Sequence, residues 1–407
     1  MEEDGSITLL DLAEEKNAYV VVRREYLIKD VGDLLKTPTV LINASEYLSM
    51  VSEKISPEIP VLGFKIHRSY VMWCKFPIKP NLDWSYLYGI VLGSQSGYTK
   101  GTLKLTVEPS VARYLKKEIL KRLKVTYSIE VRRLGNIRIV LHTPVTFILK
   151  RWKIDEGIIP KFINIHKAVE GYLNTRALKV RHPEKSEAEI YGPQPLLQQI
   201  HNYLSEIEIQ SKLSERSIRI NGKRNLSKLY ESFMIVHPTN GARLIYFEEA
   251  KKRKYLFYAL KKIPLEYRDI FYFLIWKNKI TINTLAKYLH LSQDFVADAL
   301  DYLKTLRLVD LSPGYFGLQV TYTPDSFKGI VAEEANEKLK AIENILQSQS
   351  LEYYVCNVCG KLYSFKKASD MNFKCCGTLM QRIEINTNTL RSLKIAKKKY
   401  QNLLESL

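Results

Sequence analysis

The stretch YLYGIVLGSQSGY, from Tyr86 to Tyr98, decides the expected fold of this 407-residue chain. It reads as an apolar helix that ends in small residues. A less regular second copy, FINIHKAVEGY, runs from Phe162 to Tyr172 and keeps an acid, Glu170, before its glycine. Ser94 stands at the corresponding place in the first copy. The chain therefore contains an internal repeat, and each copy opens one unit of the repeat.

The same order of expected elements follows each copy. Alternation over Thr102–Val107 puts Leu103, Leu105 and Val107 on one face, which predicts a half-buried strand. The other elements of the first unit are a helix over Val111–Leu123, strands over Thr126–Val131 and Asn136–His142, and a helix over Val145–Trp152. Those of the second unit are strands around Ala177–His182 and Glu187–Tyr191, a helix over Leu196–Ile207, a hairpin over Gln210–Asn221 and a helix over Asn225–Phe233. We predict an α+β fold with two αββαββα units.

These motifs and this element order resemble the LAGLIDADG homing endonucleases over about residues 86–235. The resemblance implies a saddle of strands that lies in the major groove of DNA. It also implies that catalysis needs a metal-binding acid from each motif helix. With Ser94 on one side and Glu170 on the other, that pair is broken, and both are expected to be vestigial. The resemblance therefore implies a DNA-binding scaffold that is not an enzyme, similar to the bacterial WhiA regulators.

The outward side chains of the expected saddle are candidates for contact with double-stranded DNA. They are Thr102, Lys104, Arg132, Arg133, Lys179, Arg181, Lys212 and Arg219. The formal net charge of +19 and the pI near 9.4 favour a polyanionic partner, because Lys and Arg release the counterions of phosphates. Alternatively, these side chains are solvated, or Lys179 and Arg181 pair with Glu187 and Glu189 across strands.

Composition limits the classes of protein that the chain can belong to. No run of about 18 apolar residues occurs, and the acidic N-terminus lacks the basic segment of a signal peptide. We therefore expect a cytoplasmic, nucleoid-associated protein without a membrane partner. The sequence has no GxxxxGK loop, which argues against nucleotide hydrolysis. Residues 1–80 predict a small α+β region without a recognisable site, ahead of the LAGLIDADG-like domain at 81–240.

Residues 250–325 predict a winged helix-turn-helix. Helices are expected over Glu266–Lys277, Asn283–Leu289 and Gln293–Leu306, the last of them capped by Ser292. A short strand is expected at Ile280–Ile282 and a hairpin from Leu308 to Tyr322. The third helix exposes Asp294, Asp298 and Asp301, and acids opposed to phosphates lower affinity for DNA. We therefore expect this module to contact protein, with RNA polymerase or replication proteins as candidate partners.

The last part of the chain predicts a metal site between two helices. A connecting helix is expected over 326–350 and a basic helix over 386–407, with a zinc-ribbon-like segment over 351–385. The candidate ligands are Cys356, Cys359, Cys375 and Cys376, while Cys74 is alone and expected to be buried. A complete ribbon has two Cys-x-x-Cys turns, but Cys375 and Cys376 are adjacent. The alternatives are weak occupancy, three thiolate ligands, or no metal.

The winged helix, connecting helix and cysteine segment together resemble archaeal transcription factor E, the counterpart of the large subunit of TFIIE. The preferred hypothesis is a non-catalytic, sequence-specific DNA-binding protein of archaeal type in transcription regulation or replication-origin binding. One alternative is a nicking or cleaving endonuclease that combines Glu170 with Asp83 or Asp155. Another is an adaptor that binds RNA polymerase.

Overall fold

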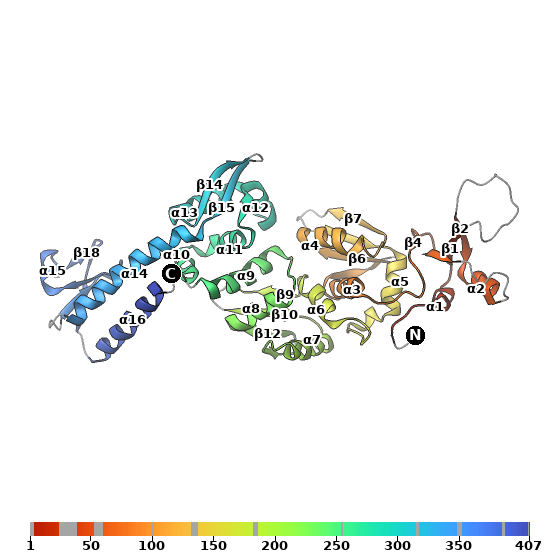
Figure 1. The fold of residues 1–407 in the computed structure, drawn as a ribbon, viewed down its shortest axis with the longest axis horizontal. Coiled ribbons are helices and arrows are strands. Elements are labelled where there is room, and N and C mark those ends of the chain that lie inside the picture. The colour runs from red at the N-terminus through yellow and green to blue at the C-terminus, as the bar shows by residue number, and fades with distance from the viewer. Residues whose placement is uncertain are drawn as a thin grey trace. The chain divides into compact units, whose positions relative to one another are not determined.

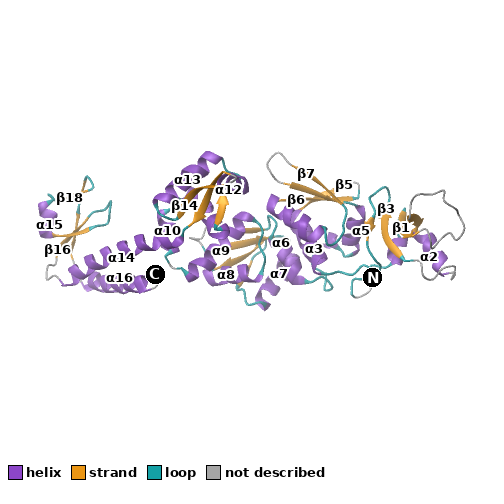
Figure 2. Ribbon diagram, turned by 45° about the horizontal axis from the view of Figure 1, so that its top comes forward, coloured by secondary structure: helices purple, strands orange, loops and turns teal. Residues whose placement is uncertain are grey.

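The structure is a computed structural model that describes residues 4–23, 39–52, 60–99, 101–131, 137–181, 186–253, 255–314, 317–347, 352–384, 387–405 and 407. The chain forms two compact units, each of mixed α and β structure (Figure 2). The first comprises Met1–Phe247 with Tyr288–His290, and the second comprises Glu248–Lys287 with Leu291–Leu407. Among the described residues, no helix combines the length and apolar character needed to cross a bilayer.

The first repeat has the element order predicted from its sequence. Its elements are α3 (Leu82–Ser94), β5 (Gln95–Thr99), β6 (Thr102–Val107), α4 (Pro109–Tyr114) continued by a π-helical turn (Leu115–Leu120), β7 (Tyr127–Val131), β8 (Ile137–Leu141) and α5 (Thr143–Arg151). The strands form an antiparallel sheet in the order β5-β6-β8-β7. Leu103, Leu105 and Val107 are buried in the core, which confirms the alternation expected for β6.

The second repeat has the same architecture (Figure 1). Its elements are α6 (Ile165–Leu173), β9 (Leu178–Val180), β10 (Glu187–Tyr191), α7 (Gln194–Glu206), β11 (Ser211–Leu213), β12 (Ser217–Asn221) and α8 (Lys223–Ser232). The sheet order is β11-β12-β10-β9. Both sheets therefore place the first, second, fourth and third strands of a repeat side by side. The predicted pair of αββαββα units is confirmed.

The N-terminal region is an α+β layer attached to α5. It contains α1 (Leu9–Ala13), β1 (Ala18–Arg23), β2 (Thr39–Asn43), α2 (Ala44–Ser52), β3 (Val61–Ile66) and β4 (Met72–Trp73), with sheet order β2-β1-β3-β4. The buried indole of Trp152 donates a hydrogen bond to the Gly5 carbonyl at 2.8 Å. The rings of Phe64 and Phe147 meet edge to face at 6.0 Å. These contacts join the layer to the first repeat, and the layer belongs to the first unit.

Helix α9 (Pro238–Lys252) covers the open edge of β9, and sequence reasoning did not predict it. The Asn240 side chain accepts a hydrogen bond from the Val180 amide at 3.1 Å and donates one to the Leu178 carbonyl at 2.9 Å. Arg243 donates to the Val180 carbonyl at 2.7 Å. Side chains of α9 thus take the place of a neighbouring strand, which satisfies backbone groups that an edge leaves unpaired.

The second unit begins with helices that pack on a small sheet. They are α10 (Leu256–Lys262), a 3-10 turn (Leu265–Tyr267), α11 (Arg268–Lys277), α12 (Ile282–Leu289) and α13 (Gln293–Thr305). The strands β13 (Lys279–Thr281), β14 (Val309–Gly314) and β15 (Gly317–Tyr322) form a sheet in the order β13-β15-β14. Ser292 caps α13 by accepting a hydrogen bond from the Phe295 amide, as the sequence predicts.

Two helices and a cysteine-containing segment complete the second unit. Helix α14 (Pro324–Gln347) packs against α16 (Thr387–Glu405), where Lys397 and Glu343 form an ion pair at 2.9 Å. Between them in sequence lie β16 (Glu352–Val355), β17 (Leu362–Ser364), α15 (Phe365–Asp370), β18 (Lys374–Cys375), β19 (Thr378–Leu379) and β20 (Gln381–Glu384). The helix expected over 326–350 is therefore present and packs along a neighbouring helix of the same unit.

Candidate nucleic-acid interface and metal centre

Helices α3 and α6 cross at Gly89 and Gly171, where the two backbones lie too close together for a residue with a side chain. A Cβ atom at Gly89 would lie 1.8 Å from the Ala168 carbonyl oxygen. A Cβ atom at Gly171 would lie 2.1 Å from the Tyr86 carbonyl oxygen. Tyr86 precedes Gly89 by three residues, just as Ala168 precedes Gly171. The contacts are therefore reciprocal, and a pseudo-twofold axis relates the two helices.

This axis pairs the residues that follow each glycine. Gly93 and Thr175 each lie four residues beyond a crossing glycine, and a Cβ at Gly93 would lie 2.3 Å from Thr175 Oγ1. The next residues, Ser94 and Arg176, are therefore counterparts. The Ser94 hydroxyl donates to the Ile90 carbonyl, and Arg176 is exposed. Neither counterpart is an acid. Sequence reasoning missed Arg176, although counting five residues from Gly171 would have found it.

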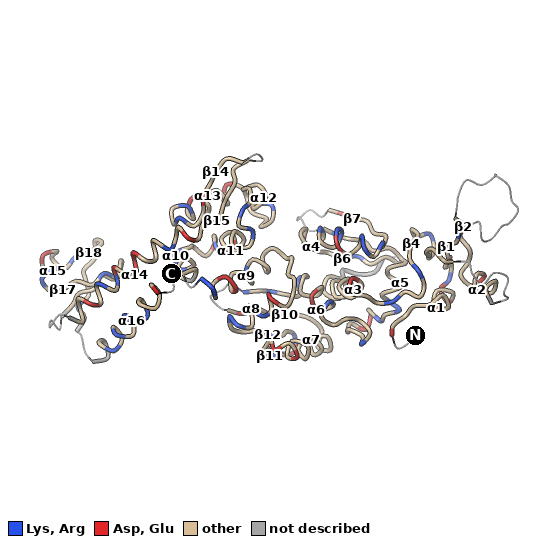
Figure 3. Tube along the Cα trace, viewed as in Figure 1, with Lys and Arg blue, Asp and Glu red and all other residues tan. Residues whose placement is uncertain are grey.

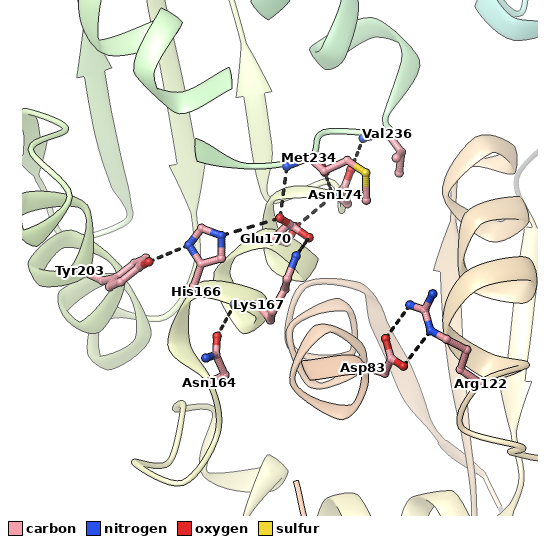
Figure 4. Close-up of polar contacts among 10 residues, drawn as sticks. All are labelled: Asp83, Arg122, Asn164, His166, Lys167, Glu170, Asn174, Tyr203, Met234 and Val236. Atoms are coloured by element: carbon pink, nitrogen blue, oxygen red, sulfur yellow. Dashed lines mark hydrogen bonds and ion pairs between the residues drawn. The ribbon is translucent and has the colours of Figure 1, made fainter. Parts of the chain in front are cut away.

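Glu170 does not lie at the counterpart of Ser94. It immediately precedes the crossing glycine of α6, so its counterpart is Tyr88 of α3. Its side chain is 3% exposed and accepts a hydrogen bond from Lys167 Nζ at 2.8 Å. It also accepts one from the Met234 amide at 3.3 Å (Figure 4). The expectation that Glu170 occupies the second acid's place is therefore corrected: its contacts join α6 to the chain after α8.

The two further acids considered for catalysis do not join Glu170. Asp83 lies in the first turn of α3, at the opposite end of the helix from Ser94, and accepts hydrogen bonds from Arg122 at 2.9 and 2.6 Å (Figure 4). Asp155 is exposed in the short turn Ile154–Glu156. Within the described ranges, no group of three or more Asp, Glu, His or Cys side chains close enough to share a metal includes Glu170.

The outer face of the second sheet carries a cross-strand row of charges. Lys212 pairs in register with Arg219, which pairs with Glu189, which pairs with Lys179. Arg219 forms an ion pair with Glu187 at 2.7 Å. Arg181 donates to Glu189 at 3.1 Å. A hydrogen bond from the Tyr191 hydroxyl, together with Arg181, lowers the pKa of the Glu189 carboxyl.

Those contacts divide the four basic candidates of this sheet into two kinds. Arg181 and Arg219 form ion pairs with glutamates of β10. The expected pairing across strands is therefore present for Arg181, whereas Arg219, and not Lys179, is the second basic partner of these glutamates. Lys179 and Lys212 are exposed and form no ion pair with any residue that the structure describes. These two lysines are therefore the stronger candidates for binding an external anion.

The first sheet turns polar side chains of β6 away from its core. Thr102 and Lys104 are half-buried and alternate with the buried leucines, as predicted. Lys104 lies opposite Val140, and the next cross-strand pair on the same face joins Thr106 to Arg138. The two other candidates of this repeat, Arg132 and Arg133, lie outside the described residues. Figure 3 marks Lys and Arg positions in both units, so basic residues are not confined to the repeats.

Burial lowers the pKa of His237 to about 4, with smaller contributions from the charges of Arg243 and Arg176. His237 directly precedes α9, and its Nδ1 atom is buried without a hydrogen-bond partner among the described residues. The Asn174 side chain holds this segment by accepting hydrogen bonds from the Val236 and His237 amides at 2.6 and 3.3 Å. Positive charge therefore gathers beside the end of α6.

The four clustered cysteines have the geometry of a metal centre. Their sulfur atoms all lie within 4.8 Å of one another. The Sγ atom of Cys375 lies 3.7 Å from that of Cys359 and 3.8 Å from that of Cys376. Bonds of about 2.3 Å to a tetrahedral zinc would separate the sulfurs by about 3.8 Å. The chain can therefore place all four thiolates around one ion.

The backbone explains how two adjacent cysteines reach the same point. Cys376 has a φ of 52°, in the left-handed region that side chains rarely adopt, and Gly377 follows with a φ of 78°. A hydrogen bond from the Cys359 amide lowers the pKa of the Cys356 thiol to about 6, which favours the thiolate. Tyr363 contacts Cys375 Sγ at 3.2 Å and supports the cluster from outside.

The first compact unit thus contains two αββαββα repeats that meet at α3 and α6, and the second compact unit carries the cysteine cluster. No family model and no curated protein matches the chain. Among solved structures, it is similar to full-length DUF199/WhiA from Thermatoga maritima, with 15% identity over 55% of this chain and 90% of that chain and a TM-score of 0.31. It is also similar to the homing endonuclease I-DmoI in complex with its target DNA, with 11% identity over 37% of this chain and 94% of that chain and a TM-score of 0.28.

Proposed function

We propose that this protein binds double-stranded DNA at a specific sequence and does not cut it. The observation that carries the proposal is the pair of residues at the pseudo-twofold axis, Ser94 and Arg176, where metal-dependent cleavage would need two acids. The exposed lysines on the outer face of the second sheet supply cations for the DNA backbone. Transcription regulation or replication-origin binding is the role that we propose for this activity.

We infer that residues 250–325 form a winged helix that contacts protein, within transcription or replication machinery. The order of three helices and a β-hairpin with a third strand supports the winged-helix assignment. Asp294, Asp298 and Asp301 are exposed on α13, the helix that would have to approach DNA. Three carboxylates on that surface oppose phosphate binding. We also infer that the cysteine segment is a zinc ribbon, because its sulfur spacing fits tetrahedral zinc.

Purified protein is expected to bind a selected DNA duplex and to leave both strands intact in the presence of magnesium or manganese. The duplex would be enriched from a random library by binding to the full-length protein, and the strands would be examined on denaturing gels. Glu170→Gln serves as the control, because Glu170 is buried in structural contacts. Specific strand cleavage by the wild type that this substitution abolishes would establish the endonuclease alternative instead.

Replacing Lys179 and Lys212 together by alanine is expected to weaken binding to that duplex and to lower the salt dependence. Each lost phosphate contact lowers the slope of log affinity against log salt by about one, so the double variant should lose about two. The matched control is Lys366→Ala with Lys367→Ala, which removes two exposed lysines from α15. Equal losses in both double variants would mean that binding depends on net charge alone.

A further inference from the structure

Arg176 is a cation beside the pseudo-twofold axis that no residue of the described chain neutralises. Arg176 follows the C-terminus of α6, is exposed, and forms neither a hydrogen bond nor an ion pair with any described residue. By contrast, Arg181 and Arg219 on the second sheet are held by carboxylates. The surface beside the axis therefore has a positive charge whose partner must come from outside the described residues.

The neighbours of Arg176 add to this charge. Arg176 and Arg243 both act on His237, whose buried Nδ1 has no partner among the described residues. Arg243 reaches the Val180 carbonyl from α9. Both positive charges act on the same imidazole, so they add to the positive potential around it, and an anion bound there would be attracted by both. Some of the cost is offset by the C-terminus of α6, where a cation interacts favourably with the helix dipole.

The connection of the motif helices to the sheets indicates where this charge lies. Helix α3 ends at Ser94 and β5 starts at Gln95, while α6 is followed after Arg176 by β9. Ser94 and Arg176 therefore stand where the two sheets begin on either side of the axis. Duplex DNA that spans both sheets has to pass this central point.

Building on the proposed function, we propose that Arg176 and the Ser94 hydroxyl bind a backbone phosphate at the centre of the DNA site. A guanidinium presents parallel N–H donors that match two phosphate oxygens, and a serine hydroxyl can add one hydrogen bond. The Ser94 hydroxyl would turn from the Ile90 carbonyl to do so. A bound phosphate at this position would be held without a metal ion.

Arg176→Ala is expected to weaken binding to the selected duplex about tenfold and to reduce the salt slope by about one. Arg176→Lys should keep the slope and lose part of the affinity, because a lysine retains the charge without the paired donors. Arg224→Ala is the matched control, since Arg224 is exposed on α8, which packs on the opposite face of the second sheet. Its affinity should equal that of the wild type.

Single methylphosphonate substitutions along the duplex locate the contact. The wild type should lose affinity when the central phosphate is neutralised, and Arg176→Ala should be insensitive to the same substitution. Non-additivity of the two changes would show that Arg176 and the central phosphate interact, which separates a direct contact from a structural effect of the variant. Suppose that the wild type binds the duplex and that Arg176→Ala keeps the same affinity, salt slope and sensitivity to neutralisation of the central phosphate. This result would overturn the inference about Arg176 but leave the proposed function standing. A wild-type protein that binds no duplex would instead refute the proposed function.

Discussion

Cys376→Ser is expected to remove the single zinc ion that the wild-type chain should bind, and residues 352–384 should unfold with its loss. The fully buried core of this segment consists of Cys356, Ala368, Cys375 and Met380, with Tyr354, Tyr363 and Phe373 packed against it, so two of its four buried members are candidate metal ligands. Such a core is too small to offset the conformational entropy of folding by itself. A structural zinc contributes about 10–16 kcal/mol in small zinc modules.

Metal analysis of the purified chain and amide hydrogen exchange over the segment would measure both effects of Cys376→Ser. The control is Cys74→Ser, because Cys74 is a lone, half-buried thiol whose pKa burial raises to about 12. The control should keep one zinc and an exchange-protected segment. Retention of zinc by Cys376→Ser would instead support the alternative of three thiolate ligands. A wild-type chain that takes up no zinc would refute the ribbon assignment.

The second large effect is expected at the crossing of the motif helices. Gly89→Ala should destabilise the first unit by about 3 kcal/mol, at the upper end of the range for overpacked buried sites. In an isolated helix the same change would stabilise by about 1 kcal/mol. Here the added carbon would lie 1.8 Å from a carbonyl oxygen of the facing backbone, so the helices must separate. The steric cost therefore exceeds the gain in helix propensity.

Chemical denaturation of the full-length chain would measure this change, with Gly329→Ala as the matched control. Gly329 lies inside α14, and a Cβ there would meet no atom within 4 Å. That substitution should stabilise by about 0.5–1 kcal/mol, since only the helix-propensity term remains. If Gly89→Ala behaved like Gly329→Ala, the close crossing and the pseudo-twofold pairing derived from it would be wrong.

Local patterns were sufficient to predict most elements of both repeats. Alternation over Thr102–Val107 predicted a strand with one buried face because successive side chains point to opposite sides of a sheet. Ser292 predicted the start of α13 because an N-cap depends on a few neighbouring residues. Local signals were absent for α9, whose role depends on Asn240 meeting a strand edge about 60 residues earlier in the chain.

The sequence by itself determined the repeat, the element order and the four cysteines as a candidate metal set. Only the tertiary structure decided what each charged residue does, because a side chain's role depends on neighbours that are distant in sequence. Glu170 directly precedes Gly171 in the sequence, which made it the expected second acid, yet the helix crossing makes Arg176 the counterpart of Ser94. Arg181 and Lys179 lie on one strand face, yet Glu189 compensates only the arginine. Ion pairs and helix crossings are set by packing in three dimensions. A single sequence gives the residues that take part but not which of them come into contact.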